Sequence, residues 1–208
     1  MDVDPDALAF GYWKTCRIVV LLIAASGCAS SAESPSEGGG PTGLARFFDA
    51  PPDDQALVLI FRPPRRGRTG WASVYEDDEM LTRFGYHSYL AHLTEPGSHR
   101  YMVVSEAADF LDAEVEGGKV YFAEIVPRTG AWKARFSLIP YPPEHPRLQK
   151  LEAWLRKSDP ITPGARDHEW HAQHAESVFG KRDAYLPKWL QKSDRPMLDQ
   201  GLEPDRVE

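Results

Sequence analysis

Cysteine is scarce in this sequence, and what there is lies near one end. The 208 residues include two cysteines, Cys16 and Cys28, and none follows position 28. The chain after Cys28 can therefore form no internal disulfide and no cysteine-ligated metal site. A folded body there must be held by its hydrophobic core, and the chain is long enough to build one.

The sequence also lacks an excess of positive charge and a long apolar run. Lys and Arg total 24 against 31 Asp and Glu, which gives a net charge of -7. A nucleic-acid-binding domain needs a basic surface to neutralise phosphates, so no nucleic-acid partner is expected. The longest apolar run, Ile18–Ala25, is too short to be a membrane-spanning helix, which needs roughly 20 residues.

Two common catalytic motifs are missing as well. Neither the H-E-x-x-H of zinc proteases nor the G-x-S-x-G of serine hydrolases occurs. His99 follows a Pro-Gly turn, but no serine or cysteine nucleophile has a recognisable context, so a structural ring that hydrogen-bonds the turn is the simpler hypothesis. The sequence therefore predicts neither an enzyme nor a cofactor.

The N-terminal segment carries a membrane-targeting pattern. Lys14 and Arg17 precede the apolar run Ile18–Ala25, and small residues lead from it to Cys28. A positive segment, an apolar segment and then Ala-Ser-Gly-Cys resemble a bacterial secretory signal with a lipobox. Residues 1–28 are therefore expected to be a signal peptide, with Cys28 as the lipid attachment site and the membrane as its partner.

Residues 29–53 are expected to form a tether and a lead-in to the folded body. The stretch from Ala29 to Gly43 is rich in Ser, Gly and Pro and has little to bury. Ala29 directly after the cysteine resembles the outer-membrane sorting pattern of Gram-negative bacteria. We expect a cell-envelope protein, anchored by lipid in the outer membrane and facing the periplasm.

Residues 54–141 show a two-residue rhythm of apolar side chains. Leu111, Ala113 and Val115 alternate with acidic residues, as in a strand with one buried face. The pattern predicts a mainly β, antiparallel two-sheet sandwich of about seven to eight strands. The expected strands are Ala56–Arg62, Trp71–Tyr75, Met80–Phe84, His87–Thr94, His99–Ser105, Ala107–Glu116, Lys119–Val126 and Trp132–Leu138.

Three segments within this region carry a family resemblance. They are Ala56–Pro63, Pro96–His99 and Val115–Phe122. In this order they resemble the opening strand, the Pro-Gly-x-His turn and the Gly-Lys-aromatic segment of the bacterial family named domain of unknown function 2846. The resemblance implies an envelope lipoprotein with a transthyretin-like or carboxypeptidase-regulatory-like sandwich, and it implies no known activity.

Residues 142–208 are expected to be a helical extension with a disordered tail. Leu148, Leu151 and Leu155 have helical spacing and should lie on the sandwich. A second helix is expected from Gly164 to about Phe179, with Gly180 as its stop. An apolar cluster around Pro187 and a disordered stretch from Met197 to Glu208 should follow.

The expected second helix carries the weak metal-site candidates. His168, His171 and His174 recur every three residues, with acidic residues nearby. At 100° per residue the outer two are about 120° apart, so one helix cannot bring all three to one ion. A solvated polar helix face is the simpler hypothesis, with a transition-metal site as the alternative.

Two further groups are weak binding candidates. Arg62, Arg65, Arg66 and Arg68 could contact phosphates of lipid A or acidic glycans, or simply form a solvated loop. Trp71, Tyr75, Tyr86 and Tyr89 could line a sugar-binding face, or belong to the core.

The leading hypothesis from the sequence is a non-catalytic, lipid-anchored envelope protein with a binding or structural role, whose ligand the sequence does not name and whose candidate partners are an envelope protein or a glycan. One alternative is a metal-dependent envelope hydrolase that uses the cluster His168, His171 and His174. The other is a glycan-binding module.

Overall fold

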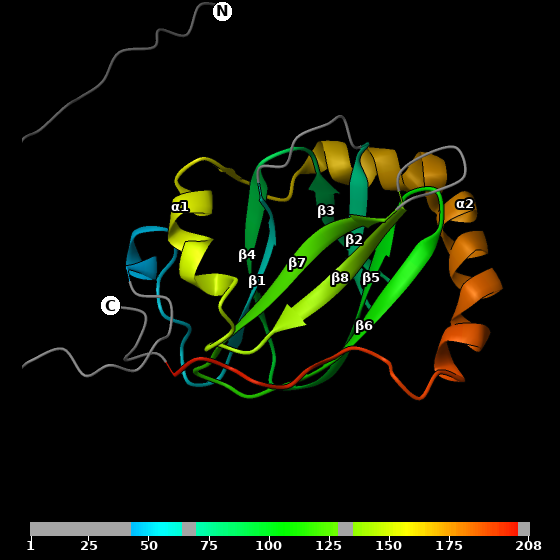
Figure 1. Cartoon of the computed structure of the whole chain (residues 1–208). Helices are drawn as coiled ribbons and strands as arrows, with labels where there is room; N and C mark the ends of the chain where they lie inside the picture. The colour runs from blue at the N-terminus through cyan, green and yellow to red at the C-terminus, as the bar shows by residue number, and fades with distance from the viewer. Residues whose placement is uncertain (1–42, 64–69, 129–134, 204–208) are drawn as a thin grey trace, which may run out of the picture. The chain divides into compact units, whose positions relative to one another are not determined.

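The structure is a computed structural model that describes residues 43–63, 70–128 and 135–203. Its folded body contains two five-stranded β-sheets whose inner faces bury a shared hydrophobic core. Figure 1 shows the two sheets with helices outside them. The expectation of a mainly β chain with two sheets and a C-terminal helical extension is confirmed.

Sheet A has the strand order β8-β7-β1-β4-β9, and sheet B has the order β10-β6-β5-β2-β3. The strands of sheet A are β8 (Arg135–Tyr141), β7 (Val120–Arg128), β1 (Ala56–Arg62), β4 (Ser88–Thr94) and β9 (Asp159–Pro160). The strands of sheet B are β10 (Met197–Leu198), β6 (Ala108–Val115), β5 (Gly97–Val104), β2 (Ala72–Glu76) and β3 (Glu79–Phe84).

The purely antiparallel arrangement predicted from sequence is wrong, because both sheets are mixed. Strand β1 pairs in parallel with β7, with Leu57 opposite Val120, while its other neighbour β4 is antiparallel. The short strands β9 and β10 also pair in parallel, with β4 and β6 respectively. Alternating side chains reveal buried faces but not strand direction, which depends on how the connections run between sheets.

Strand β1 is buried along its whole length because both of its faces are covered. Val58 and Ile60 belong to the core between the sheets. Leu57, Leu59 and Phe61 face outward, where they meet the helical turns η1 (Leu44–Arg46) and η2 (Leu148–Lys150) and the helix α1 (Leu151–Leu155). This explains why the sequence of β1 is continuously apolar rather than alternating.

The predicted leucine stripe on the first C-terminal helical segment is confirmed. Leu148, Leu151 and Leu155 are all buried against the outer face of sheet A. An ion pair between a half-buried arginine and a buried carboxylate holds this segment in place: Arg147 donates hydrogen bonds to both carboxylate oxygens of Glu124 on β7, one of them at 2.8 Å. The Glu124 carboxylate is fully buried, so this pair fixes the outer layer onto the sheet.

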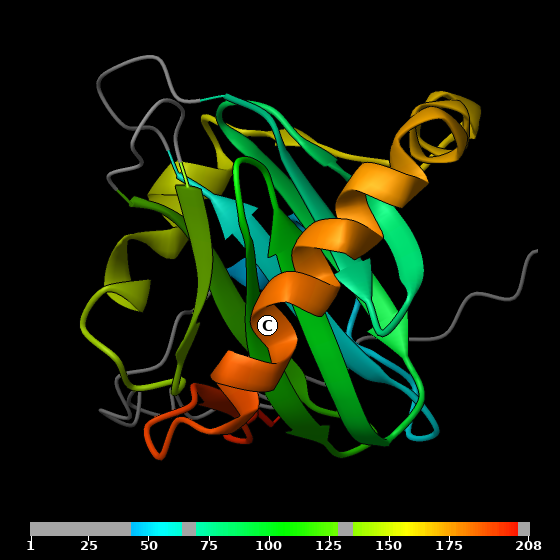
Figure 2. The same ribbon diagram turned by 90° about the vertical axis from the view of Figure 1, so that its right-hand side faces the viewer.

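The second helix is longer than predicted. Helix α2 spans Ala165–Leu190 and passes through both Gly180 and Pro187, so the expected stop at Gly180 is wrong. Its first half contacts β2 and β3, and its second half packs on Phe110 of β6. In Figure 2 this second half runs diagonally across sheet B.

Packing explains why a mid-helix glycine does not end α2. Glycine costs roughly 1 kcal/mol in a helix interior. Continuing the helix buries Trp189 against Phe110, with ring centroids 5.4 Å apart, and stacks Tyr185 on the same ring. Burial of large aromatic side chains contributes more than that cost.

The tail is partly ordered, which contradicts the expectation of disorder from Met197 onward. Strand β10 pairs with Asp112 and Ala113, and Leu202 forms a bridge with Val120. Leu198 and Leu202 are buried in two different core clusters. The tail therefore closes one end of the sandwich, while residues 204–208 lie outside the described residues.

We expect Arg147→Ala to lower the free energy of unfolding by about 3–5 kcal/mol, because it removes the cation that compensates the buried carboxylate of Glu124. The matched control is Arg156→Ala, which breaks an exposed pair with Glu152 on α1. The control should cost less than about 1 kcal/mol. Urea denaturation of both variants measures the difference, and equal costs would contradict it.

Two neighbouring residues test the extension of α2 past Pro187. Trp189 is 1% exposed and Leu190 is 43% exposed. Trp189→Ala should destabilise the fold by about 3–5 kcal/mol through loss of burial and the cavity left behind. Leu190→Ala should cost well under half as much in the same urea experiment. Similar losses would mean that α2 does not dock in this way.

Candidate functional site

A group of polar side chains surrounds Glu76, at the end of β2. Its Oε1 accepts hydrogen bonds from the hydroxyls of Thr94 and Tyr101, each at 2.8 Å. His92 Nε2 lies 2.8 Å from Oε2, and His99 Nδ1 lies 3.2 Å from Oε1. The group joins the two sheets, since β4 belongs to sheet A whereas β2 and β5 belong to sheet B.

The surroundings of Glu76 favour its ionised form. Burial by itself would raise the pKa, but hydrogen bonds from His92, Tyr101 and Thr94 and the charge of His92 lower the pKa to about 2. Burial, followed by the charge of Glu76, raises the pKa of Tyr101 above its ordinary value. The carboxylate is therefore a fixed anion with filled acceptor sites, and the Tyr101 hydroxyl is a fixed donor.

The hydrogen bonds around Glu76 suit a residue that holds the two sheets together better than a residue that acts as a general base. A catalytic base must be free to accept a proton from a substrate, whereas both oxygens of Glu76 already accept hydrogen bonds from neighbours. The hypothesis for His99 agrees with its contacts, since its Nε2 lies 2.8 Å from the Glu95 carbonyl at the Pro-Gly turn.

The three helical histidines do not converge. His171 Nδ1 lies 3.1 Å from the Tyr75 hydroxyl, and His174 Nδ1 lies 2.8 Å from the Trp170 carbonyl. His168 is exposed. Residues 43–63, 70–128 and 135–203 contain no group of three or more His, Cys, Asp or Glu arranged to hold a metal ion.

The expected basic loop is only partly described. Arg65, Arg66 and Arg68 lie outside the described residues. Arg62 does not belong to a surface patch, because it is buried and its Nη1 donates to the carbonyls of Gly70, Phe84 and Gly85. Burial lowers its pKa. Arg62 therefore connects the residues just before β2 to the last residues of β3.

The four candidate aromatic residues separate into two classes. Tyr75 and Tyr89 are buried and belong to the core, where burial raises the pKa of Tyr75 to about 12. Trp71 and Tyr86 are 60% and 45% exposed. Only these last two could present aromatic faces to a ligand.

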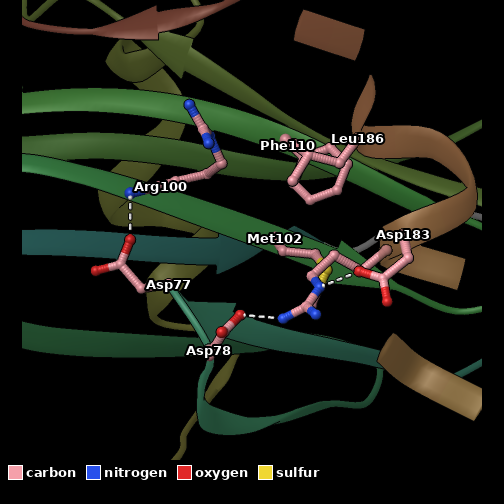
Figure 3. A pocket seen from close by; sticks show the side chains of 8 residues that line it. Asp77, Asp78, Arg100, Met102, Phe110, Asp183 and Leu186 are labelled. Atoms are coloured by element: carbon pink, nitrogen blue, oxygen red, sulfur yellow. Dashed lines mark hydrogen bonds and ion pairs between the residues drawn. The ribbon is translucent and has the colours of Figure 1, made fainter. Parts of the chain in front are cut away.

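A groove of about 400 Å³ lies between α2 and sheet B. Figure 3 shows Met102, Phe110 and Leu186 along it, with Asp77 and Asp78 from the β2–β3 turn at one side. Arg182 crosses from α2 to Asp78 at 2.5 Å and also pairs with Asp183 at 2.8 Å. The groove has the size of a small-ligand site, but these charges already hold α2 to the turn.

A second hollow of about 390 Å³ flanks the other side of α2. Its cations are Arg128, Arg135 and Lys181. Arg128 pairs with Asp109, Arg135 pairs with Glu106, and Lys181 donates to the Ser105 carbonyl. These cations also serve to connect elements of the fold.

Sequence reasoning missed the group around Glu76 and also the environment of Arg83 on β3. Glu76, His92 and His99 lie on three different strands, β2, β4 and β5, and the pairing of β2 with β5 and the facing of the two sheets bring them together. The guanidinium of Arg83 lies over the rings of Trp71 and Trp170. No motif in the sequence signals either group.

No family model, curated protein or solved structure matches this chain. The resemblance to the domain of unknown function 2846 family therefore stays a prediction. Among the described helices, none is both long and apolar enough to cross a membrane.

The low pKa of Glu76 predicts a pH-dependent contribution to stability. Its ordinary value is 4.5 and the folded value is about 2, so the stabilisation is complete above pH 4.5 and is lost as the pH falls through 2. Glu76→Gln should therefore cost about 2 kcal/mol at pH 7 and clearly less at pH 3.

The measurement is urea denaturation of wild type and variant at both pH values. Glu79→Gln, an exposed position in the same hairpin, is the matched control and should show no such change. A cost of Glu76→Gln that is the same at pH 3 and pH 7 would show that the carboxylate is not held ionised.

Proposed function

We propose that the protein is a non-catalytic, lipid-anchored module of the bacterial cell envelope that works by binding a partner or ligand. Its sandwich would be held near the outer membrane on the periplasmic side through an acyl group on Cys28. Membership of the domain of unknown function 2846 family is part of the same proposal.

The observation that carries this proposal is the order of segments along the chain. Lys14, Arg17 and the apolar run Ile18–Ala25 lead to Cys28, and the Ser/Gly/Pro-rich residues 29–42 separate it from the folded body. That body starts at once with a buried residue, Leu44. A lipidated cysteine, a spacer and then a compact domain are the parts that a tethered binding module needs.

The chemistry of the described residues supports a binding role over catalysis. Glu76, whose pKa is lowered to about 2 by its hydrogen-bonding neighbours, is used to join the two sheets. The charged side chains along the hollows beside α2 connect that helix to the sandwich. Such groups stabilise a scaffold, and a scaffold with two covered sheets can present its loops and helix surfaces to a partner.

A metal-dependent hydrolase is less well supported. The rings of His171 and His174 are directed to Tyr75 and to the Trp170 carbonyl, and His168 is on the exposed side of α2. A zinc hydrolase needs three ligands that meet at one point and an open position for water. The second alternative, glycan binding, has an observation in its favour, the exposed Trp71 beside Arg83.

The anchor is tested by Cys28→Ala in the full-length chain expressed in a Gram-negative host. Wild-type protein should incorporate radiolabelled palmitate and sediment with membranes, whereas the variant should do neither, because the thiol that carries the lipid is gone. Cys16→Ala is the matched control and should behave like wild type.

Mass spectrometry of the purified wild type adds an independent measurement. A mature N-terminus at Cys28 that carries acyl groups is expected. A Cys28→Ala variant that stays fully membrane-associated, or a wild-type chain with an unmodified Cys28, would contradict the lipid anchor.

A further inference from the structure

Arg83 on β3 lies among aromatic rings at the edge of sheet B. Its guanidinium carbon is 5.0 Å from the ring centre of Trp71 and 4.4 Å from that of Trp170. The Trp170 ring is stacked on His174, with centroids 4.4 Å apart and planes 11° apart. These residues, Trp71, Arg83, Trp170 and His174, form what we name the Arg83 cluster.

The charge of Arg83 has no polar partner in the described part of the chain. Its Nε is the one buried side-chain nitrogen or oxygen among the described residues that lacks a hydrogen-bond partner. Its guanidinium forms no ion pair with residues 43–63, 70–128 or 135–203. Buried polar groups are nearly always satisfied, so Arg83 is an exception among the described side chains.

The Nη edge of the same guanidinium is open. Neither Nη nitrogen is among the buried, unpartnered atoms, and neither donates to a described residue, so both reach the surface. The Nε beside the two indoles is buried. An anion at the Nη edge would meet a partly desolvated cation, and such an interaction is stronger than one in bulk water.

The neighbouring parts of the chain do not supply that anion. Residues 64–69, directly before this region, read Pro-Arg-Arg-Gly-Arg-Thr and contain no acid, and neither do residues 129–134. Asp167, at the start of α2, accepts hydrogen bonds from Thr82 and from the Gly164 amide. A carboxylate or phosphate from a ligand fits the position better than an internal partner.

Trp71, the exposed ring of the Arg83 cluster, is held in place by the end of β3. It directly precedes Ala72, which pairs with Phe84, and Tyr86 follows two residues after Phe84 as a second exposed ring. The Trp71 ring lies so close to Gly85 that a Cβ there would be 3.3 Å from it. Arg62 lies 5.2 Å from the centre of the Tyr86 ring and donates to the Gly85 carbonyl, which fixes this corner.

We propose that the Arg83 cluster is a binding site for an acidic saccharide. The carboxylate or phosphate of the sugar pairs with the Nη edge of Arg83, and the apolar face of the sugar ring contacts the exposed Trp71. This inference rests on the proposed binding function and names its ligand class, but it does not depend on the lipid anchor.

Four probes distinguish the source of the anion in titration calorimetry on the full-length protein in detergent. Trigalacturonate supplies a sugar carboxylate, glucose 6-phosphate supplies a sugar phosphate, maltotriose is neutral, and inorganic phosphate has no sugar. We expect at least one acidic sugar to bind with a dissociation constant of about 1 mM or tighter, with maltotriose and inorganic phosphate at least about tenfold weaker.

The variants test the role of the guanidinium. Arg83→Ala should abolish binding, and Arg83→Lys should weaken it at least about tenfold because an ammonium cannot form the planar two-pronged contact. Trp71→Ala should also weaken it. Arg156→Ala, an exposed arginine on the opposite side of the sandwich layers, is the matched control and should bind as wild type does. Circular dichroism confirms that each variant is folded.

Several results would overturn the inference. No binding of either acidic sugar at millimolar concentration would do so, as would equal binding of maltotriose, equal binding of inorganic phosphate, or unchanged binding by Arg83→Lys. None of these results bears on Cys28, whose palmitate labelling is measured separately, so failure here is distinguishable from failure of the anchor.

Discussion

Everything in this fold depends on covering both faces of β1. All seven residues of this strand are buried, and its side chains alternate between two different apolar layers. One layer requires a second sheet, and the other requires something outside sheet A. The segment from η2 to α1 fulfils the second requirement with Leu148, Leu151 and Leu155. An amphipathic extension is thus part of the core rather than an appendage.

Buried charges fix how these layers meet, because hydrophobic burial has no direction of its own. Glu124 and Arg147 attach the outer layer to sheet A. Glu76 and its neighbours join the two sheets at one place, and Asp109 joins them at another through Ser137 and Arg128. A buried ion pair adds little net stability over an apolar pair, but removing one partner is costly, so such pairs specify position.

Most buried or half-buried arginines of the described chain hold elements of the fold together, whereas one arginine is available to bind a ligand. Arg62, Arg147 and Arg182 all belong to the framework of the fold, because each connects two elements through carbonyls or carboxylates. Arg83 differs, because its described contacts are aromatic rings alone. A cation that the fold holds firmly but does not pair is suited to binding an anion, and the exposed Trp71 beside it suits a ligand with an apolar face.

Alternation and helical spacing are local properties, so the sequence is enough to predict the eight long strands and the leucine stripe that runs through η2 and α1. It also locates the apolar run Ile18–Ala25 that precedes Cys28. Tertiary structure alone decided the parallel pairing of β1 with β7, the passage of α2 through Gly180, and the ordering of the tail by Leu198 and Leu202. It likewise decided which charged residues meet, since Glu76 and His92, or Arg83 and Trp170, become neighbours only when the sheets and α2 pack. Local patterns in the sequence indicate which faces of a strand or helix are apolar. Contacts between residues distant in sequence depend on which other element covers each apolar face.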